Sequence, residues 1–388
     1  MDKIDKQLSK LEFIEDFRKQ LKNRSYTSTS QVAITTAKII LEIIKAKDLY
    51  ANIDELLKLV KLVGKMFISV DIMQFTVGNV VKRILNFIHK EKANSLNVVD
   101  VRRTTLISFN TGLFNIKDKE TETNTTNIVN NTNKSDSLSN SFKNNNQVMV
   151  DPPFSTRNRS TIMDIARNAI IEEIIQLIND LEQSHSLIVE NADNHINDND
   201  IILTANYSDQ LHEFLLEASK TKSFNVIVAE SYPSLKGLEM ANKLFKSGIK
   251  TTLISDSSIF SIMPKISKVL IGTRSVMANG GLISYNGVYN ICLAAQTFSI
   301  PVIVISGCFK LTPMYPFDHE TFNEQLSPDT IYNCKYNGDL SNITFNSPAY
   351  DYVPPEFISM FITDKGDFHP SYMYRLFNEF YSQQDFYL

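Results

Sequence analysis

The sequence is poor in cysteine. Only Cys292, Cys308 and Cys334 occur among its 388 residues, and no two of them form a Cys-x-x-Cys pair. An odd number of cysteines fits a reducing compartment better than a disulfide framework. No uninterrupted apolar run reaches the length of a membrane span, and the charged segment 1–10 lacks the apolar centre of a secretory signal. These absences predict a cytosolic protein that makes no membrane contact.

Neither sign of charge is in large excess, because 39 Lys and Arg residues stand against 43 Asp and Glu residues and give a formal net charge of -4. Broad binding to nucleic acid depends on a basic field, so the sequence predicts no direct nucleic-acid partner. A chain of this length has room for two domains. It buries roughly 70–75% of its unfolded surface, so the core needs no disulfide or metal ion to hold it.

The sequence signatures of cofactor and metal chemistry are missing as well. It contains neither the Gly-x-Gly-x-x-Gly pattern of dinucleotide-binding loops nor the Walker loop of nucleotide-binding proteins. The six histidines include no His-Glu-x-x-His pattern and no close pair with the spacing of metal ligands. We therefore expect neither a cofactor nor a metal ion.

Proline is absent before Pro152, and this part of the chain shows helical periodicity. Apolar residues recur at spacings of three and four in 31–47 and 53–63, and again in 76–92 after a turn predicted at Gly78-Asn79. The sequence therefore predicts a helical domain over residues 1–117.

The composition changes abruptly near Lys117. Residues 118–150 are polar and rich in Asn, so they cannot bury enough apolar surface to offset the entropy of ordering, and a disordered insert is predicted there. Linking helices are expected in 151–198. Thr161 and Asp164 resemble a capping box, and a long apolar stripe follows them.

Short β-branched runs alternate with helical segments from Asp200 onward. The predicted strands are 201–204, 225–230, 251–255, 268–272 and 301–306, and the predicted helices are 208–220, 234–247 and 287–298. Such runs are typical of buried parallel strands with crossover helices. The sequence therefore predicts a Rossmann-like, doubly wound α/β domain over residues 199–388, in which ligand sites lie beyond the carboxyl ends of the strands.

Several residues after these strands have two interpretations each. Asp256 is either a general acid or base or, as we favour, a helix N-cap. Asn279-Gly280-Gly281 either offers N–H groups to an anion or forms a turn with positive φ, which we favour. Arg274 either holds a phosphate or an acidic partner or is a solvated surface cation, and neither is preferred. Cys308 is interpreted as a buried, inert thiol, because no local histidine base can be assigned to it.

The loops, taken in order, resemble a known family. The segments that carry the resemblance include ILTANYS, VIVAESYPSLKGLEMANKL, KVLIGTRSVMANGG and YDYVPPEFIS. They resemble the regulatory alpha, beta and delta subunits of the guanine-nucleotide exchange factor for eukaryotic translation initiation factor 2, and the beta type most closely. The resemblance covers about residues 70–92 and 155–388.

Isomerases of methylthioribose 1-phosphate and ribose 1,5-bisphosphate share this fold. The resemblance implies that Asn206 stands where they carry a catalytic cysteine, Tyr232 where they carry a phosphate-binding arginine, and Arg274 where they carry an acid–base aspartate. Asn does not transfer a proton as a thiolate does, Tyr does not neutralise a phosphate, and Arg stays protonated. The implied pocket is vestigial, and its expected residues are Asn206, Tyr232, Asp256, Arg274, Asn279, Gly280 and Gly281.

The resemblance implies a non-catalytic regulatory subunit that scaffolds the exchange factor and helps to bind the alpha subunit of the initiation factor. The implied partners are a delta-like paralogue, the alpha, gamma and epsilon subunits, and initiation factor 2. The alternative is a sugar-phosphate isomerase or a small-metabolite sensor on the same fold.

Pairing with the delta-like paralogue is expected through the α/β domain. Asn199, Asn225 and Ile227 match positions near the beta–delta contact in the family. Tyr372 and Tyr374 join them as interface candidates, because the end of the chain is rich in aromatic residues, which are enriched at interfaces.

Overall fold

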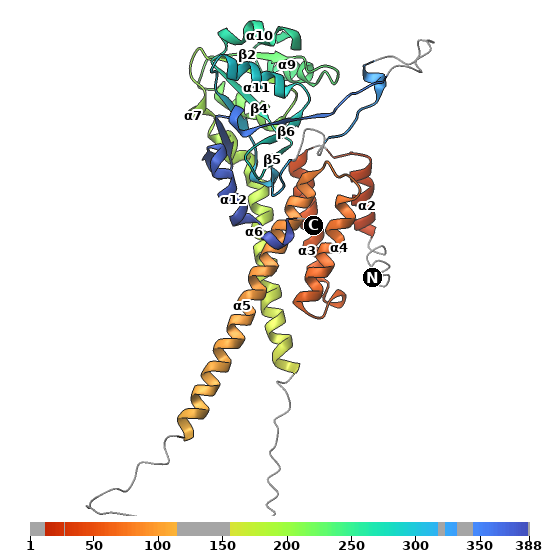
Figure 1. Ribbon diagram of the computed structural model, residues 1–388, viewed down its shortest axis with the longest axis vertical. Helices are drawn as coiled ribbons and strands as arrows, with labels where there is room; N and C mark the ends of the chain where they lie inside the picture. The colour runs from red at the N-terminus through yellow and green to blue at the C-terminus, as the bar shows by residue number, and fades with distance from the viewer. Residues whose placement is uncertain (1–11, 27, 115–155, 317–322, 332–343, 387–388) are drawn as a thin grey trace, which may run out of the picture. The chain divides into compact units, whose positions relative to one another are not determined.

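The computed structural model describes residues 12–26, 28–114, 156–316, 323–331 and 344–386 (Figure 1). The predicted insert 118–150 lies outside these residues. The contacts divide the chain into two units. One unit contains the chain up to His89 together with everything from Ala169 onward, and the other contains residues 90–168. The helices of the N-terminal part therefore share a compact unit with the α/β part, while the boundaries predicted from the sequence stay a prediction.

The N-terminal part is helical, as predicted. Its helices are α2 (Glu12–Lys22), α3 (Thr29–Lys45), α4 (Ile53–Ile68) and the first turns of α5 (Phe75–Phe114). Ser28 and Asn52 cap α3 and α4, since their side-chain oxygens accept hydrogen bonds from backbone N–H groups three residues later. The apolar stripes of these helices face one another and are buried, and the Phe17 and Phe67 rings meet edge to face with centroids 5.1 Å apart.

Two predicted boundaries in the helical part are wrong. Helix α5 begins at Phe75 and continues through Gly78 and Asn79, so no turn lies there. The buried Asn79 side chain donates a hydrogen bond of 3.1 Å to the Phe309 carbonyl. Asn79 therefore belongs to a helix surface that packs against the α/β part. Helix α6 (Thr156–Glu190) already begins before the predicted capping box, and Asp164 instead pairs with Arg167 inside the helix at 2.7 Å.

The predicted doubly wound sheet is confirmed. Its strands are β1 (Ile201–Ala205), β2 (Asn225–Ala229), β3 (Lys250–Ile254), β4 (Lys268–Gly272), β7 (Val302–Ile305), β10 (Met360–Thr363) and β11 (Gly366–Phe368). Their order is β11-β10-β7-β4-β1-β2-β3, and only the β10–β11 pair is antiparallel. The crossover helices α8 (Asp209–Ala218), α9 (Lys236–Lys246) and α11 (Val288–Thr297) fall where the periodicity predicted them.

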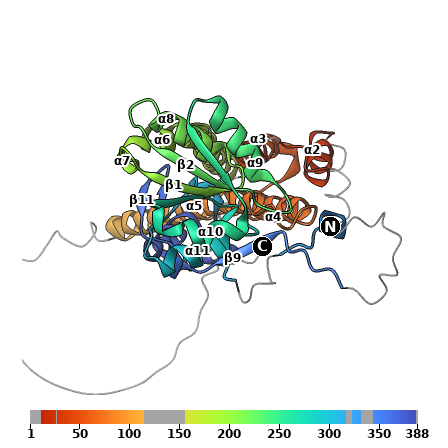
Figure 2. The same cartoon turned by 90° about the horizontal axis from the view of Figure 1, so that it is seen from above.

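Both faces of this sheet are covered, which explains the continuous apolar runs in its strands. Helices α8 and α9 lie over one face, and α10 (Ile259–Ile262) and α11 lie over the other (Figure 2). Successive residues of a strand enter opposite cores, so that Ile202 packs with Phe214 of α8 while Leu203 packs in the cluster that contains Ile291 of α11.

A second, smaller sheet was not predicted. It has the order β8-β5-β6-β9 and consists of β8 (Leu311–Thr312), β5 (Ser275–Met277), β6 (Leu282–Tyr285) and β9 (Tyr350–Val353). The chain then returns to the large sheet through β10 and β11 and ends in α12 (Met373–Phe380) and a short 3-10 turn, Gln383–Asp385. Among the described residues, no helix combines the length and the apolar character that crossing a bilayer requires.

Candidate functional site

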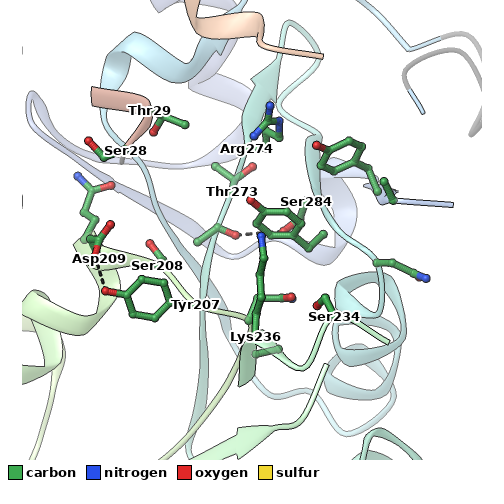
Figure 3. Close-up of a pocket in the computed structure, with 18 of the residues that line it drawn as sticks. Ser28, Thr29, Tyr207, Ser208, Asp209, Ser234, Lys236, Thr273, Arg274 and Ser284 are labelled. Atoms are coloured by element: carbon green, nitrogen blue, oxygen red, sulfur yellow. Dashed lines mark hydrogen bonds between the residues drawn. The ribbon is translucent and has the colours of Figure 1, made fainter. Parts of the chain in front are cut away.

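A cavity of about 610 Å³ lies beyond the carboxyl ends of the central strands, where a doubly wound sheet is expected to bind ligands. Its walls come from the segments after β1, β2, β4 and β7, and from residues at the start of α3 and before it, namely Arg24, Tyr26, Ser28, Thr29 and Ser30. Figure 3 shows Tyr207 and Asp209 on one side of this space and Arg274 and Lys236 on another. Residues far apart in the sequence therefore meet around one hollow.

Three of the predicted pocket residues, Asn206, Tyr232 and Arg274, line this cavity together. Asn206 directly follows β1 and has a left-handed backbone, with φ 60°. Its N–H donates to the Ser231 hydroxyl at 2.9 Å, which joins the loop after β1 to the loop after β2. The side chain of Asn206 is only 6% exposed, yet neither its Oδ1 nor its Nδ2 has a hydrogen-bond partner. Tyr232, in contrast, is more than half exposed.

Asp256 does not line the cavity, and the favoured N-cap interpretation is wrong, because Ser255 holds that position before the 3-10 helix Asp256–Ser258. Its carboxylate accepts hydrogen bonds from the N–H groups of Ser231 and Tyr232, at 3.0 and 2.7 Å. These bonds satisfy two donors in a loop where Ser231 has a φ of 60° and Leu235 a φ of 54°. Asp256 therefore holds the loop after β2 in shape.

The Asn279-Gly280-Gly281 segment also lies outside the cavity lining, and the turn interpretation is confirmed. Gly280 has a φ of 84° and links β5 to β6. The Gly280 N–H donates to the Met277 carbonyl at 2.9 Å, and the Gly281 N–H donates to Asn279 Oδ1 at 3.0 Å. The N–H groups of both glycines are therefore used within the hairpin and are not offered to an anion.

Arg274 is not a solvated surface cation, since it is only 9% exposed. Its Nε donates to the Met73 carbonyl at 3.1 Å, and its guanidinium lies 5.3 Å from the centre of the Tyr350 ring. Within the described part of the chain, no acidic side chain forms an ion pair with it. Burial lowers the pKa of Arg274, but Tyr350, Tyr285 and Tyr26 outweigh it and raise that pKa, and the side chains of Tyr26 and Tyr285 hydrogen-bond to the guanidinium.

The sequence analysis missed a second buried cation, Lys310, which is 7% exposed. Its Nζ donates to the Thr273 carbonyl at 2.9 Å. Burial, followed by repulsion from Arg274, lowers the pKa of Lys310 to about 8. Lys236 is a third cation at the cavity and lies 4.0 Å from the centre of the Tyr285 ring. Burial alone would raise the pKa of Tyr285, but Lys236 and Arg274 outweigh it and lower that pKa.

Other predicted residues lie away from the cavity. Cys308 is buried, and burial raises the pKa of its thiol strongly, as an inert thiol requires. Asn199, Asn225 and Ile227 lie at or near β2, whereas Tyr372 and Tyr374 lie beyond β11 at the opposite edge of the sheet. In the described ranges, no group of three or more His, Cys, Asp or Glu side chains is placed to hold a metal ion.

The chain belongs to the Initiation factor 2 subunit family, whose family model matches residues 26–370. It is 36% identical to translation initiation factor eIF2B subunit beta of Dictyostelium discoideum, over 96% of this chain and 95% of the relative. It is 33% identical to the subunit of the same name from Schizosaccharomyces pombe, over 94% of both chains. The resemblance to beta subunits that the loops indicated is therefore confirmed.

Two solved structures from Chaetomium thermophilum share the fold. The structure of eIF2B beta aligns with a TM-score of 0.66 at 20% identity and covers 99% of this chain and 97% of its own. The tetrameric eIF2B-beta2-delta2 complex aligns with a TM-score of 0.65 at 18% identity, covering 98% of this chain and 99% of its own. Both alignments place the helical part and the α/β part in a single fold.

Proposed function

We propose that this chain is a non-catalytic, regulatory subunit of the guanine-nucleotide exchange factor for translation initiation factor 2. The observation that carries the proposal is the 36% identity to an eIF2B beta subunit over 96% of the chain. In this role the chain scaffolds the exchange factor in the cytosol and helps to bind the alpha subunit of the initiation factor. Its further partners are the alpha, gamma, delta-like and epsilon subunits.

The side chains in the cavity support a role without catalysis. By the resemblance, the isomerase reaction would need a thiolate at position 206 and a carboxylate at position 274. This chain has the amide of Asn206 and the guanidinium of Arg274 there. The Arg274 guanidinium stays protonated at neutral pH and donates to a carbonyl, so it does not accept a proton from a substrate. The purified chain should therefore not convert a 1-phosphorylated aldose to its ketose.

Pairing with a delta-like subunit is supported by two exposed apolar side chains at one edge of the large sheet. Strand β3 is the last strand on its side, and Leu253 on this strand is 43% exposed. Phe260, in the segment after β3, is 57% exposed. Exposed large apolar side chains beside an edge strand are typical of a contact surface. Asn199, Asn225 and Ile227 are the interface candidates nearer this edge, and Tyr372 and Tyr374, which are 37% and 57% exposed, are candidates at the opposite edge of the sheet.

Affinity purification of the tagged native protein, with identification of the partners, tests the proposal. We expect the exchange-factor subunits to co-purify in fixed ratio. Recovery of the chain alone from an extract in which those subunits are abundant would contradict it. The pairing is tested separately by co-expression with the delta-like chain and mass measurement in solution, where a monomer at micromolar concentration would refute the heterodimer.

A further inference from the structure

Lys310 is a buried lysine without an acidic partner. It closes the 3-10 turn Cys308–Lys310 after β7 and is only 7% exposed. Its Nζ donates to the Thr273 carbonyl at 2.9 Å, and among the described residues no carboxylate forms an ion pair with it. A carbonyl accepts a hydrogen bond from a neutral amine as well as from an ammonium ion, so this contact satisfies the nitrogen without requiring its charge.

The surroundings of this amine favour its neutral form. Burial and repulsion from Arg274 lower the pKa of Lys310 to about 8, and Asp209 opposes them more weakly. Arg274 keeps its own charge, because three tyrosines outweigh burial and raise its pKa. About half of the Lys310 side chains are therefore uncharged at pH 8 and have a free electron pair on the nitrogen. Burial beside a second cation is one of the ways in which proteins turn a lysine into a nucleophile.

Lys310 also belongs to a cavity with room for a small reagent. Lys310 and Arg274 both line the hollow of about 610 Å³ beyond the central strands. Figure 3 shows Arg274 at this space together with Thr273, whose carbonyl accepts the hydrogen bond from the Lys310 amine. An uncharged reagent enters such a site without the desolvation cost that an ion incurs. The site therefore combines a nucleophilic amine, free volume and a neighbouring fixed positive charge.

We propose that carbon dioxide reversibly modifies the Lys310 side chain to a carbamate. The nitrogen electron pair attacks the carbon of CO2, an N–C bond forms while one C=O π bond breaks to leave a carboxylate, and the nitrogen releases one proton to water. The step needs no oxidant or reductant. Because the product is an anion, the like charges of Lys310 and Arg274 become opposite charges, which stabilises the carbamate. The inference goes beyond the proposed function and does not depend on it.

Lys82 is an internal control that separates this reaction from an effect of pKa alone. It is 4% exposed, its Nζ donates to the Phe386 carbonyl at 2.8 Å, and burial lowers its pKa to about 8 as well. Lys82 does not line the cavity, however, and the neighbouring charge that acts on it is the carboxylate of Asp385, which repels a carbamate. Lys310 should therefore be modified by CO2 and Lys82 should not.

Carbon-13 NMR of the purified full-length chain, equilibrated at pH 8 with labelled bicarbonate and CO2, tests the proposal. We expect a carbamate signal that disappears when CO2 is removed. Ethylation of the carbamate with a trialkyloxonium salt, followed by mass mapping of peptides, should place the adduct on Lys310. If no carbamate forms at millimolar CO2, or if Lys82 and exposed lysines react as much as Lys310, the proposal is overturned.

Three variants locate the reaction. Lys310→Arg keeps the positive charge but lacks a nucleophilic amine, so the mapped carbamate should vanish, whereas Lys82→Met should retain it. Arg274→Met should lower the carbamate fraction about tenfold at fixed CO2 pressure, because the amine holds its proton more tightly and the product loses its counter-charge. An unchanged fraction in Arg274→Met would contradict the stabilisation by the guanidinium. If that variant does not fold, the comparison of Lys310 with Lys82 in the wild type decides.

Discussion

Asp385 ties the end of the chain to the N-terminal helices. Its carboxylate is 1% exposed and lies 2.6 Å from Lys61 Nζ on α4 and 2.9 Å from His89 Nε2 on α5. Next to it, Lys82 Nζ donates to the Phe386 carbonyl at 2.8 Å. We predict that Asp385→Asn, which removes the charge and keeps the shape, loosens this attachment.

The magnitude follows from how deeply each partner is buried. Removing one member of a fully buried ion pair destabilises a protein by about 3–5 kcal/mol, because the other charge loses its partner. Here the Lys61 side chain is 36% exposed and that of His89 is 20% exposed, so water recovers part of the loss. We therefore expect a loss of about 2 kcal/mol, a sizeable share of the stability of a typical domain.

Urea unfolding followed by circular dichroism measures this loss, and Asp180→Asn serves as the matched control. Asp180 pairs with Lys365 at 3.1 Å in a far more exposed setting, so the control should lose only about 0.5 kcal/mol. Hydrogen exchange should quicken in α4 and at the start of α5 but not in α8. An Asp385→Asn protein as stable as the control, or one with faster exchange everywhere, would refute the attachment.

Three further predictions concern other parts of the chain. Gly237→Ala should destabilise the protein by about 3 kcal/mol or more in urea, because the new Cβ would lie 1.8 Å from a β2 carbonyl oxygen, whereas Gly78→Ala, with 3.4 Å of clearance inside a helix, should stabilise it by about 0.5–1 kcal/mol. Since burial lowers the pKa of Lys310 from 10.5 to about 8, the folded protein loses this proton before the unfolded chain does. The wild type should therefore gain about 3 kcal/mol relative to Lys310→Met as the pH rises from 8 to 10.5, and urea midpoints that keep a constant gap would contradict this. Replacing Tyr372 and Tyr374 with Asp should break the heterodimer with the delta-like chain, and circular dichroism must show that the unpaired variant is still folded.

The large sheet was predictable because its central strands are buried on both faces. Runs such as 201–204 and 268–272 are apolar throughout, and helical segments of the right length separate them. The small sheet gave no such signal, since β5 has three residues and β8 has two. Gly78-Asn79 misled the prediction because this pair usually marks a turn, while here it supplies helix packing and a hydrogen bond to a distant carbonyl.

The cavity was only partly predictable for a similar reason. Asn206, Tyr232 and Arg274 follow strands of the parallel sheet, whose carboxyl ends meet at one edge, and the family resemblance singled them out. Lys310 follows a strand of the same sheet. Its burial depends on the small sheet and on contacts with distant residues such as Thr273, which local sequence patterns do not predict. Arg24, Tyr26 and Ser28 also line the cavity, although all three lie far before β1 in the sequence. Only the tertiary fold brings them there, so the sequence did not predict them.

Arg274 and Lys310 show how unequally the fold treats two buried cations in the cavity. Burial lowers the pKa of Arg274, but Tyr350, Tyr285 and Tyr26 outweigh burial and raise that pKa, so the fold itself stabilises the guanidinium charge. For Lys310, burial and repulsion from Arg274 prevail and lower the pKa to about 8. The fold therefore favours the charge on one cation and disfavours it on the other, and the pH dependence of the Lys310→Met variant measures the second effect.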